Sequence, residues 1–367
     1  MKWSWKIGRV AGIDLYMHAT FLLLIAFVGF SHWLEEQTIA AVLSGIAFIL
    51  ALFVCVVLHE YGHALTARRF GITTRDITLL PIGGVARLER MPEDPKQELF
   101  VALAGPAVNV VIAALLFGIL VMTNTIEAID GLTVTRGSFI ERLMIVNVSL
   151  VVFNLIPAFP MDGGRVLRAL LAMRLDYTQA TQWAATLGQG IALIFGFIGF
   201  FTNPFLVFIA LFVWIGAAQE AGMVQLKSSL GGIPVYRAMI TDFRTLSPRN
   251  SLADAVELIL SGAQQDFPVV DNGQVVGILQ RNDLIAALQK SGESALVEQV
   301  MRRDFEPIDG AAMLDTASVR LQTCSCSTMP VVQRGQLVGL VTMENLGEFL
   351  MIRAALSGKR SPALVRS

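Results

Sequence analysis

The chain has 367 residues, of which 54% are hydrophobic and only 16% are charged. Ordinary globular proteins contain about 25% charged residues, so this composition argues against a wholly soluble protein. The net charge of -1 gives no general reason to expect a nucleic-acid partner. The apolar excess lies in residues 13–222, and we therefore expect a membrane domain followed by a soluble domain.

Apolar runs in the first part of the chain have the length of membrane-spanning helices, which need about 20 apolar residues. Six runs meet this length: 15–34, 38–66, 98–123, 138–160, 184–201 and 204–222. The last two are joined only by Thr202, Asn203 and Pro204, so they form either two spans or a shallow re-entrant pair. The first run lacks a small-residue cleavage site, which predicts a retained span rather than a signal peptide.

The placement of Lys and Arg predicts the orientation in the membrane. Basic residues concentrate before the first run and in the second and fourth connections, whereas the other connections contain only Arg136. We therefore expect a multi-pass protein of the cell (inner) membrane, with its N-terminus and its C-terminal domain in the cytoplasm. Cys324 and Cys326 are too close for an easy disulfide and lack the spacing of a zinc knuckle, so we expect neither.

The second connection contains two short β-prone stretches, Ile77–Leu80 and Val85–Leu88, separated by Pro81 and two glycines. This pattern predicts one or two short strands at the cytoplasmic membrane surface. Two interpretations are equally open. An exposed strand edge could hold an extended peptide by main-chain hydrogen bonds, or the segment could be an ordinary connecting hairpin.

A metal-binding pattern, His59-Glu-Tyr-Gly-His63, ends the second apolar run. Residues i and i+4 lie on one face of a helix, so both imidazoles can bind one Zn²⁺ while Glu60 acts as general base. The alternative is two partly buried histidines beside an unrelated glutamate. Ionisable residues at membrane depth are costly and mark functional sites, which favours the zinc site.

The best candidate for a third zinc ligand is Asp162, which follows Asn154 and two prolines and precedes two glycines. The prolines break the helix, and broken backbone at membrane depth is tolerated where it lines a cavity. Helix 38–66 starts outside, so His59 lies about 30 Å further in. Asp162 is expected at a similar depth. The alternative, a solvated Asp162 at a helix end, leaves the polar Asn154 unexplained.

From about residue 233 to 351 the chain repeats itself with a constant offset. Phe267-Pro-Val-Val matches Met329-Pro-Val-Val, and Gly273-Gln-Val-Val-Gly matches Gly335-Gln-Leu-Val-Gly. Each repeat is predicted as helix, strand, strand, helix. We therefore divide the chain into a membrane domain (1–226), two repeats (233–290 and 295–352) and a tail (353–367) that we expect to be disordered.

The membrane domain resembles the site-2 proteases, which are intramembrane zinc metalloproteases. The resemblance covers nearly all of residues 1–222 and runs through three motifs: His59-Glu60-x-x-His63, Ala104-Gly-Pro-Ala-Val-Asn109, and Asn154…Pro157…Pro160-x-Asp162-Gly163. It implies that His59, His63 and Asp162 bind one Zn²⁺, that Glu60 is the catalytic base, and that Asn154 is a polar active-site residue able to stabilise the oxyanion. For Asn109 we expect a hydrogen bond between helices.

The repeat resembles a tandem CBS-domain pair, a module that often binds adenine nucleotides and regulates a neighbouring domain. The family's ribose-phosphate motif is Gly-x-x-Thr/Ser-x-x-Asp. The first repeat keeps Asp283 but has Gln280 in place of the hydroxyl, and the second keeps Thr342 but has Asn345 in place of the carboxylate. Two interpretations stay open: an adenine-nucleotide site that uses Asp283 and Thr342, or a structural module that forms a homodimer.

The expected architecture is a polytopic α-helical membrane domain of about six spans, with a short membrane-associated β segment, followed by an α/β tandem CBS domain. The resemblance implies hydrolysis of peptide bonds within or near the transmembrane segment of single-span regulatory proteins, that is, regulated intramembrane proteolysis. Membrane lipid is the other expected partner. Two alternatives are a CBS-regulated transporter, which would need polar residues through several spans, and a catalytically inactive membrane adaptor.

Overall fold

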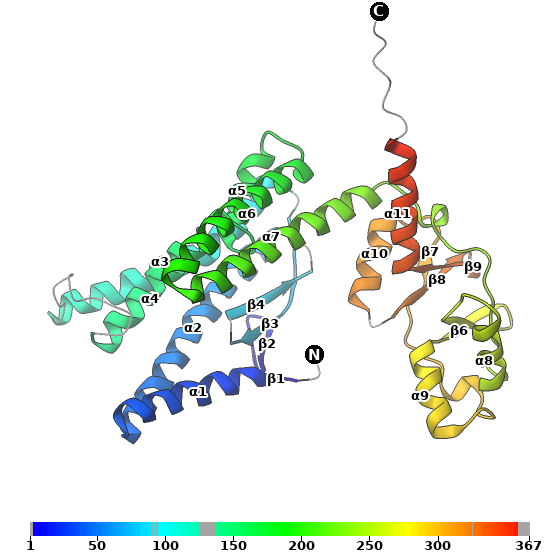
Figure 1. Ribbon diagram of the computed structural model, residues 1–367, viewed down its shortest axis with the longest axis horizontal. Coiled ribbons are helices and arrows are strands. Elements are labelled where there is room, and N and C mark those ends of the chain that lie inside the picture. Colours follow the sequence, from blue (N-terminus) through cyan, green and yellow to red (C-terminus); the bar gives the residue numbers. More distant parts are fainter. Residues whose placement is uncertain are drawn as a thin grey trace, which may run out of the picture. The chain divides into compact units, whose positions relative to one another are not determined.

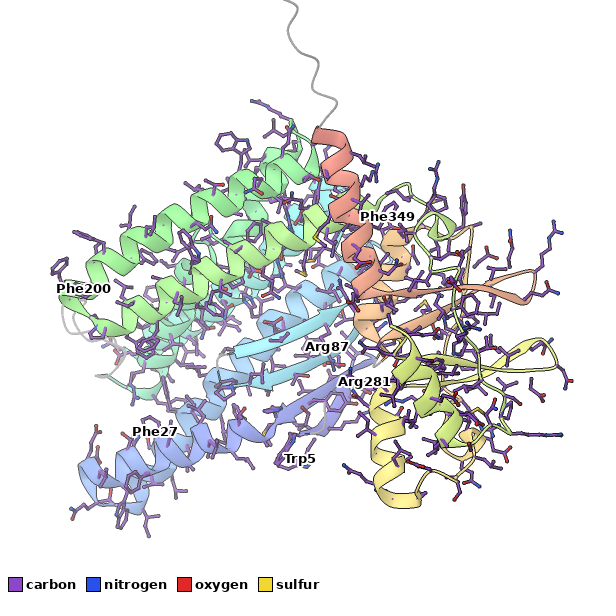
Figure 2. The ribbon with its side chains drawn as sticks, turned by 45° about the vertical axis from the view of Figure 1, so that its right-hand side comes forward. Trp5, Phe27, Arg87, Phe200, Arg281 and Phe349 are labelled. Carbon is purple, nitrogen blue, oxygen red and sulfur yellow. A yellow bond between two sulfur atoms is a disulfide. The ribbon has the colours of Figure 1, made fainter. Side chains whose placement is uncertain are left out.

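The computed structural model describes residues 3–81, 83–89, 91–92, 94–124, 137–324 and 326–358. The chain divides into two compact units, Met1–Val224 and Gln225–Ser367. Five of the described helices are long and apolar enough to cross a membrane: α1 (Ala19–Glu36), α2 (Ile39–Arg69), α3 (Pro95–Thr123), α6 (Tyr177–Thr202) and α7 (Pro204–Leu230). Large apolar side chains project outward from them, as Phe27 and Phe200 do in Figure 2. The first unit is therefore a multi-pass membrane domain.

Five helices of spanning length are described where the sequence predicted six spans. The difference lies at 138–160, where helix α4 (Phe139–Asn154) has only 16 residues. The chain then follows bends and turns until α5 (Asp162–Ala172) begins. Proline cannot continue a helix, so the apolar residues around Pro157 belong to a broken segment. Helices α6 and α7 have 26 and 27 residues, long enough for two separate spans.

A four-stranded sheet packs against α2 in the first unit (Figure 1). Its order is β1-β2-β3-β4, and the strands are β1 (Ser4–Val10), β2 (Ile13–His18), β3 (Thr74–Leu80) and β4 (Gly83–Leu88). The pair β2–β3 is parallel and the other two pairs are antiparallel. The strands expected in the second connection are confirmed. The first predicted span is corrected, because residues 15–18 belong to β2 and α1 begins only at Ala19.

The second unit contains the predicted repeat (Figure 1). The first repeat has α8 (Leu252–Ser261), β5 (Phe267–Asp271), β6 (Gln274–Leu279) and α9 (Arg281–Ser291). The second has α10 (Leu314–Thr323), β8 (Thr328–Gln333), β9 (Gln336–Thr342) and α11 (Met343–Gly358), with the short strand β7 (Ile308–Asp309) beside β8. The order helix, strand, strand, helix is confirmed in both repeats, and each repeat has its own buried core.

The hairpins of the two repeats use matching turns. Asn272 and Gly273 have φ values of 48° and 79°, and Arg334 and Gly335 have 52° and 82°. Two consecutive residues with positive φ form the tight turn whose twist suits a two-residue hairpin. The shared turn reflects the constant offset between the repeats in the sequence.

Two expectations for the second unit are wrong. Helix α11 continues to Gly358, so residues 353–358 are helical rather than part of a disordered tail. Residues 359–367 lie outside the described residues. A disulfide joins Cys324 and Cys326, where the spacing predicted none.

Candidate metal centre

Three side chains predicted as zinc ligands converge in the membrane domain. The Nε2 atoms of His59 and His63 on α2 are 3.1 Å apart. The Oδ2 atom of Asp162 lies 3.2 Å from Nε2 of His59 and 3.1 Å from Nε2 of His63. All three residues are buried. The helical i, i+4 spacing brings the two histidines to one face of α2, and α5 supplies the carboxylate from 99 residues further along the chain.

Hydrogen bonds at the opposite ring nitrogens determine which atoms the histidines present to the centre. Nδ1 of His63 lies 2.7 Å from the carbonyl oxygen of Val101, which can only accept, so this nitrogen carries the proton. Nδ1 of His59 lies 2.5 Å from Oδ1 of Asn109. The Nδ2 atom of Asn109 donates to Oδ1 of Asn147 at 2.8 Å, which orients the amide so that Oδ1 accepts from His59. In the neutral imidazoles, both Nε2 atoms therefore present their lone pairs to the centre.

Two imidazole nitrogens and a carboxylate oxygen face one another in this buried place, an arrangement that a shared cation stabilises. Ligands about 2.0–2.2 Å from a tetrahedral zinc ion are separated by roughly 3.3–3.6 Å, slightly more than the 3.1–3.2 Å observed here. Oxygen partners that hold the other nitrogen of a ligating histidine are also typical of zinc sites. The residues present therefore fit a zinc ion.

One face of α3 forms a wall of the centre. Val101, Gly105 and Asn109 follow at intervals of four residues and lie on the same side of the helix. A Cβ atom added at Gly105 would lie 2.7 Å from Nε2 of His59 and closer still to Nε2 of His63. Only glycine at this position leaves space for the two imidazoles and an ion between them.

The broken segment before α5 delivers Asp162. Pro157 and Pro160 exclude a regular helix there, and Asp162 is the first residue of α5. A Cβ atom added at Gly164 would lie 2.6 Å from the backbone nitrogen of Phe159, and one at Gly163 would collide with the carbonyl oxygens of the preceding turn. The two glycines therefore let the segment fold back closely onto the start of α5, which directs Asp162 towards α2.

Strand β4 lies directly beside Glu60. The backbone N–H of Ala86 donates to Oε2 of Glu60 at 3.3 Å. A Cβ atom added at Gly84 would lie 2.7 Å from Cγ of Glu60. Because β4 is an edge strand of the four-stranded sheet, the residue predicted as catalytic base is placed next to a sheet edge.

Asn154 hydrogen-bonds within its own helix rather than with the three predicted ligands. It is the last residue of α4, and its Nδ2 atom donates to the carbonyl oxygen of Leu150 at 3.0 Å. Within the described part of the chain, none of its hydrogen bonds reaches His59, His63 or Asp162. The bond between helices expected for Asn109 is confirmed by its contact with Asn147 on α4. Asn147 was missed, although a buried polar residue within an apolar run was a signal for it.

The two predicted CBS residues occupy different environments. The carboxylate of Asp283 accepts two hydrogen bonds from Arg302, at 2.6 Å and 3.1 Å. Thr342 instead lines a cavity of about 410 Å³ in the second unit. Asp283 is not among the residues that line this cavity, so the structure does not bring the two residues to one site.

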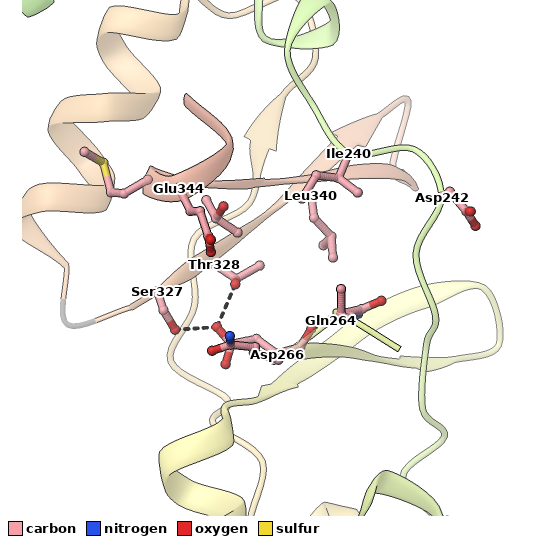
Figure 3. Close-up of a pocket in the computed structure, with 12 residues that line it drawn as sticks. Ile240, Asp242, Gln264, Asp266, Ser327, Thr328, Leu340 and Glu344 are labelled. Carbon is pink, nitrogen blue, oxygen red and sulfur yellow. Dashed lines mark hydrogen bonds between the residues drawn. The ribbon is translucent and has the colours of Figure 1, made fainter. Parts of the chain in front are cut away.

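Three carboxylates border the cavity at Thr342, those of Asp242, Asp266 and Glu344. No Lys or Arg is among its lining residues. Figure 3 shows the Asp266 carboxylate bonded to the hydroxyls of Ser327 and Thr328, the latter at 2.7 Å. The lining therefore carries three negatively charged groups, while Ile240 and Leu340 provide apolar surface.

Comparisons with known proteins agree with the two units. The model of peptidase family M50 matches residues 47–198, and the CBS domain model matches residues 232–290 and 297–351. A zinc metalloprotease of Methanocaldococcus jannaschii is 32% identical over 348 residues, which cover 94% of this chain and 96% of that relative. Stage IV sporulation protein FB of Bacillus subtilis is 30% identical over 133 residues, covering 36% of this chain and 43% of that protein.

A solved structure is also similar to part of this chain. The site-2 protease from Methanocaldococcus jannaschii is 35% identical, covers 60% of this chain and 95% of its own, and has a TM-score of 0.44.

Proposed function

Because this chain belongs to peptidase family M50, the site-2 proteases, and carries a CBS pair, we propose that it cleaves single-span membrane proteins within or near their transmembrane segments. The family makes the chain a zinc metalloprotease of the membrane. The observation that carries the proposal is the convergence of His59, His63 and Asp162 beside Glu60. The proposed substrates are regulatory proteins released by regulated intramembrane proteolysis.

In the proposed mechanism, His59, His63 and Asp162 hold the zinc ion and Glu60 moves the proton. Zinc, when bound, supplies a Lewis acid that activates water and polarises a carbonyl group. The Glu60 carboxylate takes the proton from the attacking water and returns it to the leaving amine. Asn109 and the Val101 carbonyl keep both imidazoles in the tautomer and orientation that the ion requires. For Asn154 we propose oxyanion stabilisation, which requires its amide to leave Leu150 when substrate binds.

The edge strand β4 is the proposed substrate platform. An extended peptide can add to a sheet edge through main-chain hydrogen bonds, and at β4 it would lie beside Glu60. A peptide bond inside a helix is shielded and already hydrogen-bonded, so the substrate must unwind locally before cleavage. Two test substrates examine this need for local unwinding. One has Gly and Pro in its transmembrane segment, and the other has an uninterrupted leucine segment. We expect cleavage of the first only, and equal cleavage of both would contradict a strand-like binding mode.

We propose that the N-terminus and the CBS pair lie in the cytoplasm. The support is the concentration of basic residues before the first run and in the second and fourth connections. His59 follows the start of α2 by 20 residues, which corresponds to about 30 Å along the helix. With the proposed orientation, this depth supports a centre near the cytoplasmic side of the membrane. Cysteine labelling of intact cells at positions in the α1–α2 connection and in the second unit tests the orientation.

For the CBS pair we propose a regulatory role with an adenine nucleotide as ligand, bound in the cavity at Thr342. Asp283 is already engaged by Arg302, so the first repeat lacks a free carboxylate for a ribose. The cavity at Thr342 has the volume and the mixed apolar and polar lining of a small-molecule site. Nucleotide binding to the purified chain, measured by calorimetry, tests this assignment, and a structural or dimerising role predicts no binding.

A further inference from the structure

A fully buried arginine, Arg168, lies on α5 six residues after Asp162. Its Nε atom donates to Oε1 of Glu98 at 2.8 Å, and Nη2 donates to the same oxygen. Its Nη1 atom donates to Oε1 of Glu220 at 2.5 Å. The guanidinium carbon also lies 5.0 Å from the ring centres of Phe159 and Tyr177. The Arg168 cluster (Glu98, Arg168 and Glu220) therefore joins α3, α5 and α7.

The Arg168 cluster is poorly explained as a source of stability. Removing charges from water is expensive, and buried ion pairs often stabilise a protein no better than apolar residues of similar volume. Two carboxylates here face one guanidinium. In addition, Oε2 of Glu98 is buried without a hydrogen-bond partner in the described structure. A cluster with this cost is better explained by the geometry that it imposes on the three helices.

That geometry concerns the proposed zinc centre. Glu98 lies on the same face of α3 as Val101, Gly105 and Asn109. On this face, the Val101 carbonyl accepts a hydrogen bond from His63 and Asn109 orients His59. Gly105, between them, lies against both imidazoles. Through Glu98 it also holds Arg168, and thereby the helix that begins with Asp162. One helix face is thus connected to all three proposed ligands.

The position of Asp162 depends on how α5 docks. Helix α5 has only 11 residues, its N-cap Met161 makes no side-chain capping bond, and the segment before it is irregular. The position of Asp162 therefore depends on the docking of α5 as well as on the tight turns at Gly163 and Gly164. The ion pairs of Arg168 with Glu98 and Glu220 are the polar contacts that hold this short helix against α3 and α7.

We propose that Arg168 is a positioning residue of the zinc centre, which sets the approach of Asp162 to His59 and His63 through its ion pairs with Glu98 and Glu220. This inference rests on the proposed zinc site.

The test measures zinc affinity of the full-length chain in detergent by competition with a chelator. Glu220→Gln keeps the shape of the side chain and removes its charge, whereas Arg168→Ala leaves two buried carboxylates unpaired and is expected to unfold the protein. We expect Glu220→Gln to weaken zinc binding by about 10- to 100-fold. Glu98→Gln should act in the same direction. Lys6→Gln, which removes the Lys6–Asp14 ion pair between β1 and β2, is the control and should leave zinc affinity unchanged.

A double-mutant comparison separates positioning from a general structural effect. If Glu220 acts through Asp162, Glu220→Gln should cause no further loss of zinc affinity in an Asp162→Asn background. An equal loss in both backgrounds would overturn the inference, as would unchanged zinc affinity in both Glu98→Gln and Glu220→Gln. Wild-type protein that binds no zinc would instead overturn the proposed site itself. Thermal unfolding of the zinc-free variants, measured in parallel, shows how much of any loss comes from stability alone.

Discussion

The Nδ1 atom of His59 on α2 lies 2.5 Å from the side-chain oxygen of Asn109 on α3, and the amide of Asn109 is in turn bonded to Asn147 on α4. This chain of hydrogen bonds connects three helices and ends at a proposed zinc ligand. These contacts explain two buried asparagines in predominantly apolar helices by one requirement, the orientation of the His59 imidazole.

Replacing Asn109 by Leu should weaken zinc binding. The substitution removes the hydrogen-bond acceptor at Nδ1 of His59, so the ring is free to change tautomer and orientation. Loss of a hydrogen-bond partner of a metal-binding histidine lowers metal affinity by about 10- to 100-fold. Chelator competition measures the effect. Asn203→Ala, in the connection between α6 and α7, is the control. An Asn109→Leu variant with wild-type zinc affinity would show that the hydrogen bond has no part in metal binding.

A methyl group at Gly105 should abolish zinc binding. Its Cβ atom would lie 2.7 Å from Nε2 of His59, where it displaces the imidazoles from the ion. Gly118→Ala on the same helix is a matched control, because a Cβ atom there meets nothing within 4 Å. We expect Gly118→Ala to retain zinc and activity. Metal analysis of both purified variants decides the point, and stoichiometric zinc in Gly105→Ala would contradict the arrangement described here.

Gly84→Ala separates the role of Glu60 from that of the metal. The added Cβ atom would lie 2.7 Å from Cγ of Glu60 but is not directed at the histidines. Zinc content should therefore stay normal while the rate of cleavage falls, by up to about 100-fold if the carboxylate moves by 1 Å. Gly8→Ala in β1, where a Cβ atom meets nothing within 4 Å, should have no effect. Loss of zinc together with activity would mean that β4 supports the metal rather than the base.

Neutralising Glu344 should strengthen binding of an adenine nucleotide if the cavity at Thr342 is its site. The phosphate group would face Asp242, Asp266 and Glu344, so removal of one charge relieves repulsion worth about 1 kcal/mol, which corresponds to roughly fivefold in affinity. Calorimetry with AMP compares wild type with Glu344→Gln. Glu257→Gln, which lies outside this cavity, is the control. An equal effect of both variants would mean that AMP does not occupy this cavity.

The sequence predicted the second unit well because its signals are local. Two-residue turns at Asn272 and Arg334 and the constant offset between repeats determine the order of elements without long-range information. The convergence of His59, His63 and Asp162 was also accessible, since helical spacing joins the first two and the proline-glycine pattern marks the third. Their roles as ligands stay predictions.

Other features depended on tertiary partners that no single segment reveals. Strand β2 is apolar and continuous with α1, so residues 15–18 were assigned to the helix, whereas pairing with β1 and β3 makes them a strand. Arg168 was counted only as a basic residue of a cytoplasmic connection. Its burial depends on Glu98 and Glu220, which lie 70 and 52 residues away in the chain.

The central claim, that this chain is a protease whose base is Glu60, is tested most directly by cleavage of a tagged single-span substrate by purified protein in detergent. Wild type and Glu60→Ala are compared after zinc content has been measured for both. We predict zinc-dependent product from wild type and none from Glu60→Ala at equal zinc content. Equal product from the two proteins would contradict the assignment of Glu60, and absence of product from zinc-loaded wild type across several substrates would contradict proteolysis itself.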